Sequence, residues 1–254
     1  AYEEWEAQPE QHQLELSRAL LRRQADKHLA HSNRRLQQLT EQLPTRSHHY
    51  ALCQWQQEML ADQYALYRSP RRESPHLQRA NDALDRFYGA AKLRIACDMA
   101  SRNRAINAQY QCHFIEDVLR VFGQKQLQPS LQTYYQALMM LSSEEEQHYR
   151  ALRELLAQHA PLFSSEEQQD LYDYAQNYCV KRINSGDAAY YQDILELYKL
   201  MLEQGVLLRG GYLTQWSYIN IVTAGIRLQE YDWTDWFIHS YREQLAPETR
   251  DNVF

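Results

Sequence analysis

A turn-like dipeptide recurs in the later part of the chain at a spacing of about 43 residues. Each occurrence separates two segments whose apolar residues have helical spacing, so one repeat is a pair of antiparallel helices. A helix pair cannot bury both of its faces alone, and a tandem array of pairs is therefore expected to stack into a superhelix with a concave inner wall. The four dipeptides are Ser101-Arg102, Ser142-Ser143, Ser185-Gly186 and Gln229-Glu230.

The composition independently favours an all-α fold. Glycine and proline occur only seven times each in 254 residues, which is too few for a β-rich chain with many tight turns. Leu, Ala, Gln, Glu and Arg, which favour helices, dominate instead. The hydrophobic fraction of 44% is sufficient for a sizeable core, and we predict an ordered, all-helical protein.

Prolines fall between the periodic segments, where the missing N–H costs least. Ser164 before Glu167 predicts a capping box, Ser142 and Ser143 predict a hydroxyl cap before Glu144, and Asp187 and Asp232 are candidate caps of the two following helices. Helices are predicted at 10–43, 47–68, 75–101, 104–122, 129–142, 145–159, 165–185, 188–204, 212–228 and 232–245.

The last repeat resembles a known family. The stretch from Tyr218-Ile219-Asn220-Ile221 through Ala224, Leu228, Glu230, Tyr231, Asp232 and Phe237 to Pro247 is similar to a tetratricopeptide repeat. It departs from that pattern at Val222, where the family has a small residue, at Thr234, where it has alanine, and in a period longer than the family's 34 residues. The resemblance extends over residues 85–250 and implies protein or peptide binding in a concave groove, with no catalytic residue to carry over.

We therefore predict a tetratricopeptide-like α-solenoid over residues 75–254. Residues 1–74 lack the repeat and are expected to form a helical hairpin of two long helices that caps the array, with an exposed loop around Pro70. The hairpin and the array are alternatively one continuous domain.

Tyrosine is unusually frequent, with 19 residues beside five tryptophans. At helical spacing most of these rings are expected to fill the core between stacked pairs, and the remainder to lie along the groove, where tyrosine suits recognition. If the first helix of each pair lines the inner wall, the candidate groove residues are Tyr135, Tyr178, Lys181, Arg182, Asn220 and Arg227.

The charge is unevenly distributed. Residues 1–127 carry 18 Lys and Arg against 15 Asp and Glu, whereas residues 128–254 carry 9 against 18. The basic half, with Arg22-Arg23, Arg34-Arg35, Arg71-Arg72 and Arg102/Arg104, leaves open a nucleic-acid-associated regulator as an alternative function. Interleaved acids make ordinary solvated helix faces the simpler interpretation.

No complete catalytic or metal motif is present in the sequence. Glu145–His148 has the Glu-x-x-His spacing of a di-iron bundle, but the second such motif, at Glu73–His76, spans a proline-broken loop. Cys112-His113 is one adjacent pair on a predicted helix, and the histidines, including His48-His49, are scattered over polar stretches. Without a nucleophile elbow or phosphate loop, we expect no enzyme, no cofactor and no resident metal; a metal-binding helical-bundle enzyme is the remaining alternative.

Four cysteines lie far apart within apolar segments, as reduced thiols do. The sequence shows no basic-then-apolar leader with a cleavage site and no apolar run of about 18 residues, so we expect a cytoplasmic protein that is neither secreted nor membrane-spanning. Its expected partner is a protein or peptide, whose identity no motif gives. The late aromatics around Trp216 and Trp236 leave a homo-oligomer open.

Overall fold

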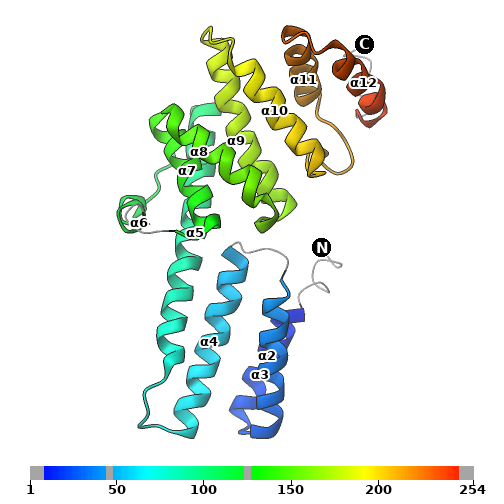
Figure 1. Ribbon diagram of the computed structural model, residues 1–254. Helices are drawn as coiled ribbons and strands as arrows, with labels where there is room; N and C mark the ends of the chain where they lie inside the picture. The colour runs from blue at the N-terminus through cyan, green and yellow to red at the C-terminus, as the bar shows by residue number, and fades with distance from the viewer. Residues whose placement is uncertain (1–8, 44–47, 123–126, 246–254) are drawn as a thin grey trace. The chain divides into compact units, whose positions relative to one another are not determined.

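The computed structural model describes residues 9–43, 48–122 and 127–245. These residues form eleven α-helices and two short 3₁₀ helices, and within them the only β-like pairings are two isolated bridges (Figure 1). The all-α prediction is therefore confirmed. The helices are α2 (Pro9–Arg22), α3 (Asp26–Glu41), α4 (His48–Arg68), α5 (Pro75–Ala105), α6 (Ile115–Phe122), α7 (Pro129–Ser143), α8 (Glu146–His159), α9 (Ser165–Asn184), α10 (Tyr190–Glu203), α11 (Gln215–Arg227) and α12 (Tyr231–Tyr241).

Three of the prolines predicted to lie between helices are the first residues of helices. Pro9, Pro75 and Pro129 are the first residues of α2, α5 and α7, where a helix needs no N–H donor. Pro44 and Pro247, the latter closing the tetratricopeptide resemblance, lie outside the described residues.

The chain divides into two compact units, each built from three segments. Unit 1 comprises residues 1–99, 109–135 and 161–163, and unit 2 comprises residues 100–108, 136–160 and 164–254. Helices α5 and α7 contribute residues to both units. No helix in the described residues is long and apolar enough to cross a bilayer.

Unit 1 begins with three helices. The prediction of a single helix over 10–43 is wrong. The chain reverses at Gln24, which has φ 56°, and the amides of Gln24 and Ala25 close a Schellman motif on Leu21 and Leu20. The hydroxyls of Ser17 and Ser32 then meet at 2.7 Å between α2 and α3. The two-helix hairpin is thus replaced by α2, α3 and α4, whose buried residues Leu14, Leu36 and Leu60 form a common cluster.

The first of the four predicted turns is also wrong. Helix α5 continues through Ser101-Arg102 to Ala105, because neither residue leaves the helical conformation. The helix expected over 104–122 is reduced to α6, preceded by left-handed residues at Asn107 and Phe114.

Three further close contacts are made within unit 1. A Cβ atom at Gly89 would lie 2.5 Å from the ring of Phe122, so α6 packs directly against the backbone of α5. The rings of Tyr134 and Phe163 meet edge to face at 5.6 Å. The Sγ of Cys97 donates to the carbonyl of Tyr134.

In unit 2 the predicted turn at Ser142-Ser143 is displaced to Glu144, after the end of α7, whereas the turns at Ser185-Gly186 and Gln229-Glu230 are confirmed. The three turns are centred on Glu144, Gly186 and Gln229, all with positive φ (61°, 96° and 61°). At Gly186 and Gln229 the chain closes Schellman motifs of the same type, which satisfy the last carbonyls of α9 and α11. Each helix from α8 to α12 packs against the next one along the chain. The tetratricopeptide-like superhelix stays a prediction.

One of the predicted helix caps is confirmed, and the others are wrong. The Ser164–Glu167 capping box is present in full. Asp187 and Asp232 do not cap, since Ala189 and Glu230 precede α10 and α12 instead. Ser142 and Ser143 belong to the end of α7 and Glu144 to the turn after it, so that cap prediction is wrong.

Tyrosines fill the core of unit 2, as the spacing indicated. Tyr149, Tyr172 and Tyr198, from α8, α9 and α10, are almost completely buried.

Helices α11 and α12 approach each other closely at Gly225, where an added Cβ would lie 2.0 Å from Thr234 Oγ1. The small-residue contact is therefore made by Gly225 and not by Val222.

Candidate functional site

The structure brings together three of the six candidate groove residues. Tyr178, Lys181 and Arg182 lie in the last two turns of α9. Asn220 and Arg227 lie on α11, and Tyr135 lies in the part of α7 that belongs to unit 1. The α9 group is therefore the centre of a site in unit 2.

A cavity of about 240 Å³ opens beside this group. Three helices line it, namely the end of α5, the second half of α7 and α9. Its floor is apolar and buried, whereas Arg104 and Lys181 stand at 37% and 54% side-chain exposure. The lining residues are Ser101, Arg104, Ala105, Met140, Leu141, Tyr174, Asn177, Tyr178 and Lys181.

The two cations hold a carboxylate of the same chain. Arg104 Nη2 lies 2.8 Å from Glu144 Oε1, and Lys181 Nζ donates to Glu144 Oε2. The hydrogen bond from Lys181 and the charge of Arg104 lower the pKa of Glu144, so this carboxylate is ionised at neutral pH. Tyr178 Oη also donates to the Glu144 carbonyl at 3.3 Å. Arg104 and Lys181 thus form a site whose geometry already accepts a carboxylate.

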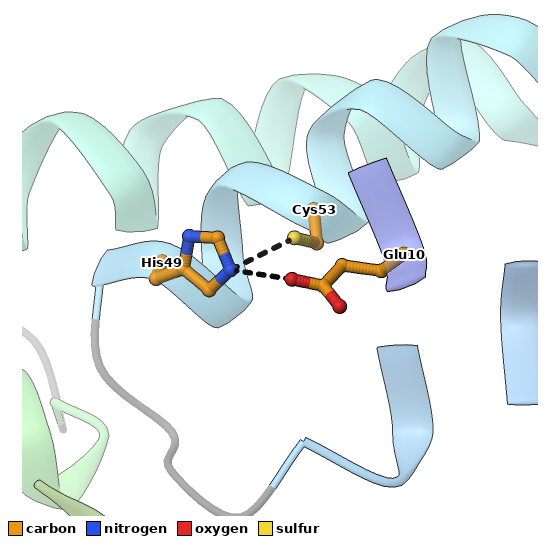
Figure 2. A group of neighbouring side chains, drawn as sticks. All are labelled: Glu10, His49 and Cys53. Atoms are coloured by element: carbon orange, nitrogen blue, oxygen red, sulfur yellow. Dashed lines mark hydrogen bonds and ion pairs between the residues drawn. The ribbon is translucent and has the colours of Figure 1, made fainter. Parts of the chain in front are cut away.

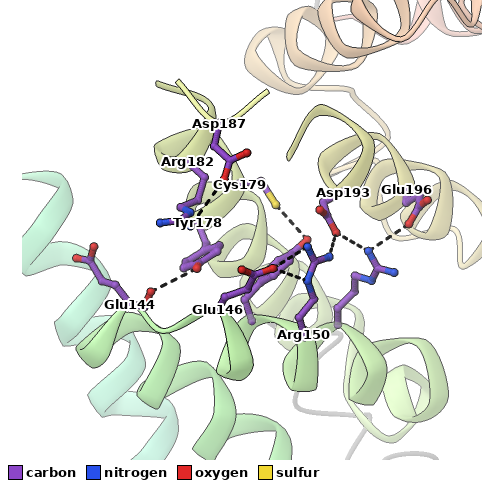
Figure 3. Close-up of polar contacts among 11 residues, drawn as sticks. Glu144, Glu146, Arg150, Tyr178, Cys179, Arg182, Asp187, Asp193 and Glu196 are labelled. Atoms are coloured by element: carbon purple, nitrogen blue, oxygen red, sulfur yellow. Dashed lines mark hydrogen bonds and ion pairs between the residues drawn. The ribbon is translucent and has the colours of Figure 1, made fainter. Parts of the chain in front are cut away.

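A cluster of tyrosines and arginines surrounds Tyr178, and its members Tyr178, Arg150 and Arg182 are labelled in Figure 3. The ring of Tyr178 stacks on that of Tyr149 at 4.9 Å, and the Tyr190 ring lies 5.8 Å from each of them. The guanidinium groups of Arg150 and Arg182 lie over the Tyr190 ring at 5.6 and 5.4 Å. These cation–π and ring contacts fix Tyr178, and with it the wall of the cavity.

Two buried groups of this cluster, Cys179 and Tyr149, are held in their protonated form. Cys179 Sγ donates to Tyr149 Oη at 3.1 Å, and burial raises the pKa of Cys179 to about 12. Burial also raises the pKa of Tyr149, so both groups stay protonated at neutral pH. Neither group is a candidate nucleophile.

Asp193 ties α10 to α8. Its side chain is only 7% exposed and accepts hydrogen bonds from Arg150 and Arg153, while Arg153 also reaches Glu196 at 3.2 Å (Figure 3). Sequence reasoning missed Asp193, and it missed the pairing of Glu144, because the partners come from different helices and no local pattern marks them.

On α11, Asn220 and Arg227 share a face with exposed apolar residues. Trp216, Ile219 and Ile226 are 76%, 38% and 52% exposed. Spacings of three, four and seven place them with Asn220 and Arg227 on one side of the helix. Asn220 Nδ2 donates to Tyr198 Oη at 3.3 Å, so it is already engaged inside the unit.

The metal-type pairs considered from the sequence do not close into sites. His148 Nε2 lies 3.8 Å from Glu145 Oε2, and its Nδ1 contacts Gln136, an amide. Cys112 and His113 precede α6 and are not on a helix, which corrects the expectation. His76 contacts Glu58 in place of Glu73. Among the described residues, one group of three metal-type ligands lies within mutual reach, namely Glu10, His49 and Cys53.

No protein-family model, curated protein or solved structure matches this chain.

Proposed function

We propose that this chain is a helical-repeat interaction module of tetratricopeptide-like type, which binds an acidic segment of a partner protein at the α5–α7–α9 cavity. The observation that carries the proposal is the clasp of Arg104 and Lys181 on the Glu144 carboxylate, at the rim of an apolar hollow. A partner carboxylate that displaces Glu144 makes the same charge-assisted hydrogen bonds. An adaptor, scaffold or regulatory sensor acts through such a preformed surface.

The size and lining of the cavity favour a peptide over a small-molecule substrate. At about 240 Å³ the cavity is smaller than the usual 300–1,000 Å³ of a ligand pocket, and it suits one apolar side chain. Burying a side chain of the size of leucine contributes about 1.5–3 kcal/mol, to which the ion pair with Arg104 and Lys181 adds. The lining combines the cations Arg104 and Lys181 with apolar surface, which supports binding of an acidic segment that carries an apolar side chain.

The proposal is tested by selecting ligands from a displayed library of random linear peptides. We expect enrichment of peptides with Asp or Glu beside a large apolar residue. Lys181→Glu is expected to weaken binding of the selected peptides at least about 10-fold, equivalent to ~1.4 kcal/mol, because it reverses one charge of the clasp. Glu144→Gln is expected to strengthen their binding, because it removes the charge of the competing carboxylate.

Arg120→Glu is the matched control. This arginine is 72% exposed, lies in unit 1 and pairs with Asp117, so the same charge reversal leaves the cavity intact. Selected peptides that bind Lys181→Glu as well as the unchanged chain, or that lack acidic residues, would refute the clasp as the binding site.

A second candidate is nucleic-acid binding by unit 1. Arg34, Arg68, Arg72 and Arg79 line one hollow of about 570 Å³, which they share with Glu58 and Glu73. Four arginines in one hollow suit phosphate groups. Retention of RNA or DNA that falls steeply with added salt, and that survives Lys181→Glu, would favour this candidate over the peptide module.

We propose that the protein is cytoplasmic. All four cysteines are free thiols, and Cys53, Cys97 and Cys179 are buried. A homo-oligomer through the exposed face of α11 remains a second use of the module, read out by light scattering of Trp216→Ser against the unchanged chain.

A further inference from the structure

Three side chains with metal-binding chemistry converge in unit 1 (Figure 2). Glu10 comes from the first turn of α2, and His49 and Cys53 come from successive turns of α4. Glu10 Oε1 lies 3.1 Å and Cys53 Sγ 3.6 Å from His49 Nε2, and the three ligand atoms lie within 4.8 Å of one another. Residues 39 positions apart in the sequence thus meet at one point.

The cluster is arranged differently from a catalytic relay. In a nucleophile–histidine–acid triad, the imidazole uses one ring nitrogen for the nucleophile and the other for the acid. Here the thiol and the carboxylate both face the same nitrogen, Nε2. One ring nitrogen carries either one proton or one lone pair, so it cannot serve both partners at once.

The cysteine is also a poor nucleophile by itself. Burial and the nearby Glu10 carboxylate raise the pKa of Cys53 to about 12, which leaves the thiol protonated. The Glu10 side chain is only 5% exposed, although carboxylates are seldom buried without a strong partner. A cation among the three ligand atoms would satisfy the carboxylate and favour the thiolate.

Two of the three distances between ligand atoms fit a single tetrahedral ion, and the third, between Glu10 and Cys53, lies within 4.8 Å. Ligand atoms about 2.0–2.3 Å from one zinc ion lie about 3.3–3.6 Å from each other, close to the 3.1 and 3.6 Å found here. The i, i+4 spacing of His49 and Cys53 presents two ligands on one helix face, as in known zinc helices. One oxygen, one nitrogen and one sulfur suit Zn²⁺ and not Mg²⁺ or Ca²⁺, which take oxygen ligands.

We propose that Glu10, His49 and Cys53 form a binding site for one thiophilic divalent cation, Zn²⁺ in preference to the alkaline-earth ions. Three protein ligands leave a fourth position for water or another donor. On binding, the Cys53 thiol loses its proton to solvent as the Sγ–metal bond forms, with no change of oxidation state. The ion links the start of α2 to α4 and stabilises unit 1.

The site is tested with Co²⁺ as a spectroscopic probe of the chelator-treated full chain. We expect one Co²⁺ per chain, a thiolate-to-cobalt charge-transfer band and visible bands of tetrahedral intensity, all displaced by one equivalent of Zn²⁺. Cys53→Ser is expected to abolish the charge-transfer band. Glu10→Gln is expected to weaken Co²⁺ binding at least about 10-fold, because mutation of even the outer partners of metal ligands lowers metal affinity by that factor.

Cys112→Ser is the matched control, because this cysteine is more accessible and lies outside the cluster, and it is expected to keep the band. Far-UV circular dichroism without metal checks that each variant is folded. His49→Gln, at a side chain 36% exposed, provides a second test if Cys53→Ser does not fold. Absence of the band in the unchanged chain, its survival in Cys53→Ser, or unchanged affinity in both Glu10→Gln and His49→Gln would overturn the proposal.

Discussion

Asp193 illustrates how much a single buried charge organises in unit 2. Its carboxylate is almost completely removed from solvent, yet it accepts hydrogen bonds from two arginines of α8 that are themselves 42% and 35% exposed. A buried ion pair often contributes little net stability, but removal of one partner leaves the other charge uncompensated. Because the arginines keep access to water, the loss here is smaller than for a fully buried pair.

Asp193→Asn is expected to lower the free energy of unfolding by about 2 kcal/mol, because charge-assisted hydrogen bonds become neutral ones. Urea denaturation at neutral pH measures the change. Asp235→Asn provides the comparison, since Asp235 is 75% exposed and its pairing with His239 contributes at most about 0.5 kcal/mol. Equal effects of the two substitutions would mean that Asp193 does not tie α8 to α10.

The residue scale also explains why the candidate sites were only partly predictable. The repeat predicted Tyr178 and Lys181 on an inner wall, which stays a prediction, and in the structure both line the α5–α7–α9 cavity. The carboxylate between Lys181 and Arg104 was assigned to a helix start, because Ser142 and Ser143 before it resemble a cap. The Glu10–His49–Cys53 group has no sequence signal beyond the spacing of His49 and Cys53, since Glu10 joins it through folding alone.

At the scale of elements, helices were predictable where the apolar spacing is strong and their ends less so. Gly186 marks its turn, because glycine adopts positive φ without steric cost. Gln24 also has positive φ, but glutamine is not a residue type that predicts a helix end, so the break between α2 and α3 could not be predicted from it. That break depends on tertiary contacts such as the Ser17–Ser32 hydrogen bond, which override a weak local preference for helix.

The crossing of α11 and α12 depends on Gly225. Gly225→Ala is expected to lower the free energy of unfolding by about 1–3 kcal/mol, because the new Cβ would lie 2.0 Å from Thr234 Oγ1. Adding Thr234→Ala removes that atom and leaves the nearest carbon 3.2 Å away, so the double variant is expected to recover most of the loss.

A double-mutant cycle measured by thermal and urea denaturation gives the coupling between the two positions. We expect at least about 1 kcal/mol, as for residues in direct contact. Additive effects of Gly225→Ala and Thr234→Ala would show that the helices do not approach at this point.

On the scale of the whole molecule, the two units are expected to respond separately to core damage. Leu29 of α3 and Leu171 of α9 are completely buried, one in each unit. Leu29→Ala and Leu171→Ala are each expected to cost about 2–5 kcal/mol through lost burial and a residual cavity.

Hydrogen exchange followed by mass spectrometry distinguishes the two effects. Leu29→Ala is expected to accelerate exchange mainly in α2, α3 and α4, and Leu171→Ala mainly in α8, α9 and α10. Acceleration of both units to the same degree by either variant would indicate one cooperative structure.

The edge-to-face contact of Phe163 with Tyr134 has a consequence for biosynthesis. Unit 1 contains most of the first 135 residues but also takes Pro161–Phe163, a segment that follows α8. A ribosome makes the chain from its N-terminus, so it must translate all of α7 and α8 before the last piece of unit 1 leaves the exit tunnel. The contact between Tyr134 and Phe163 therefore forms only after α8, a part of unit 2, has been synthesised.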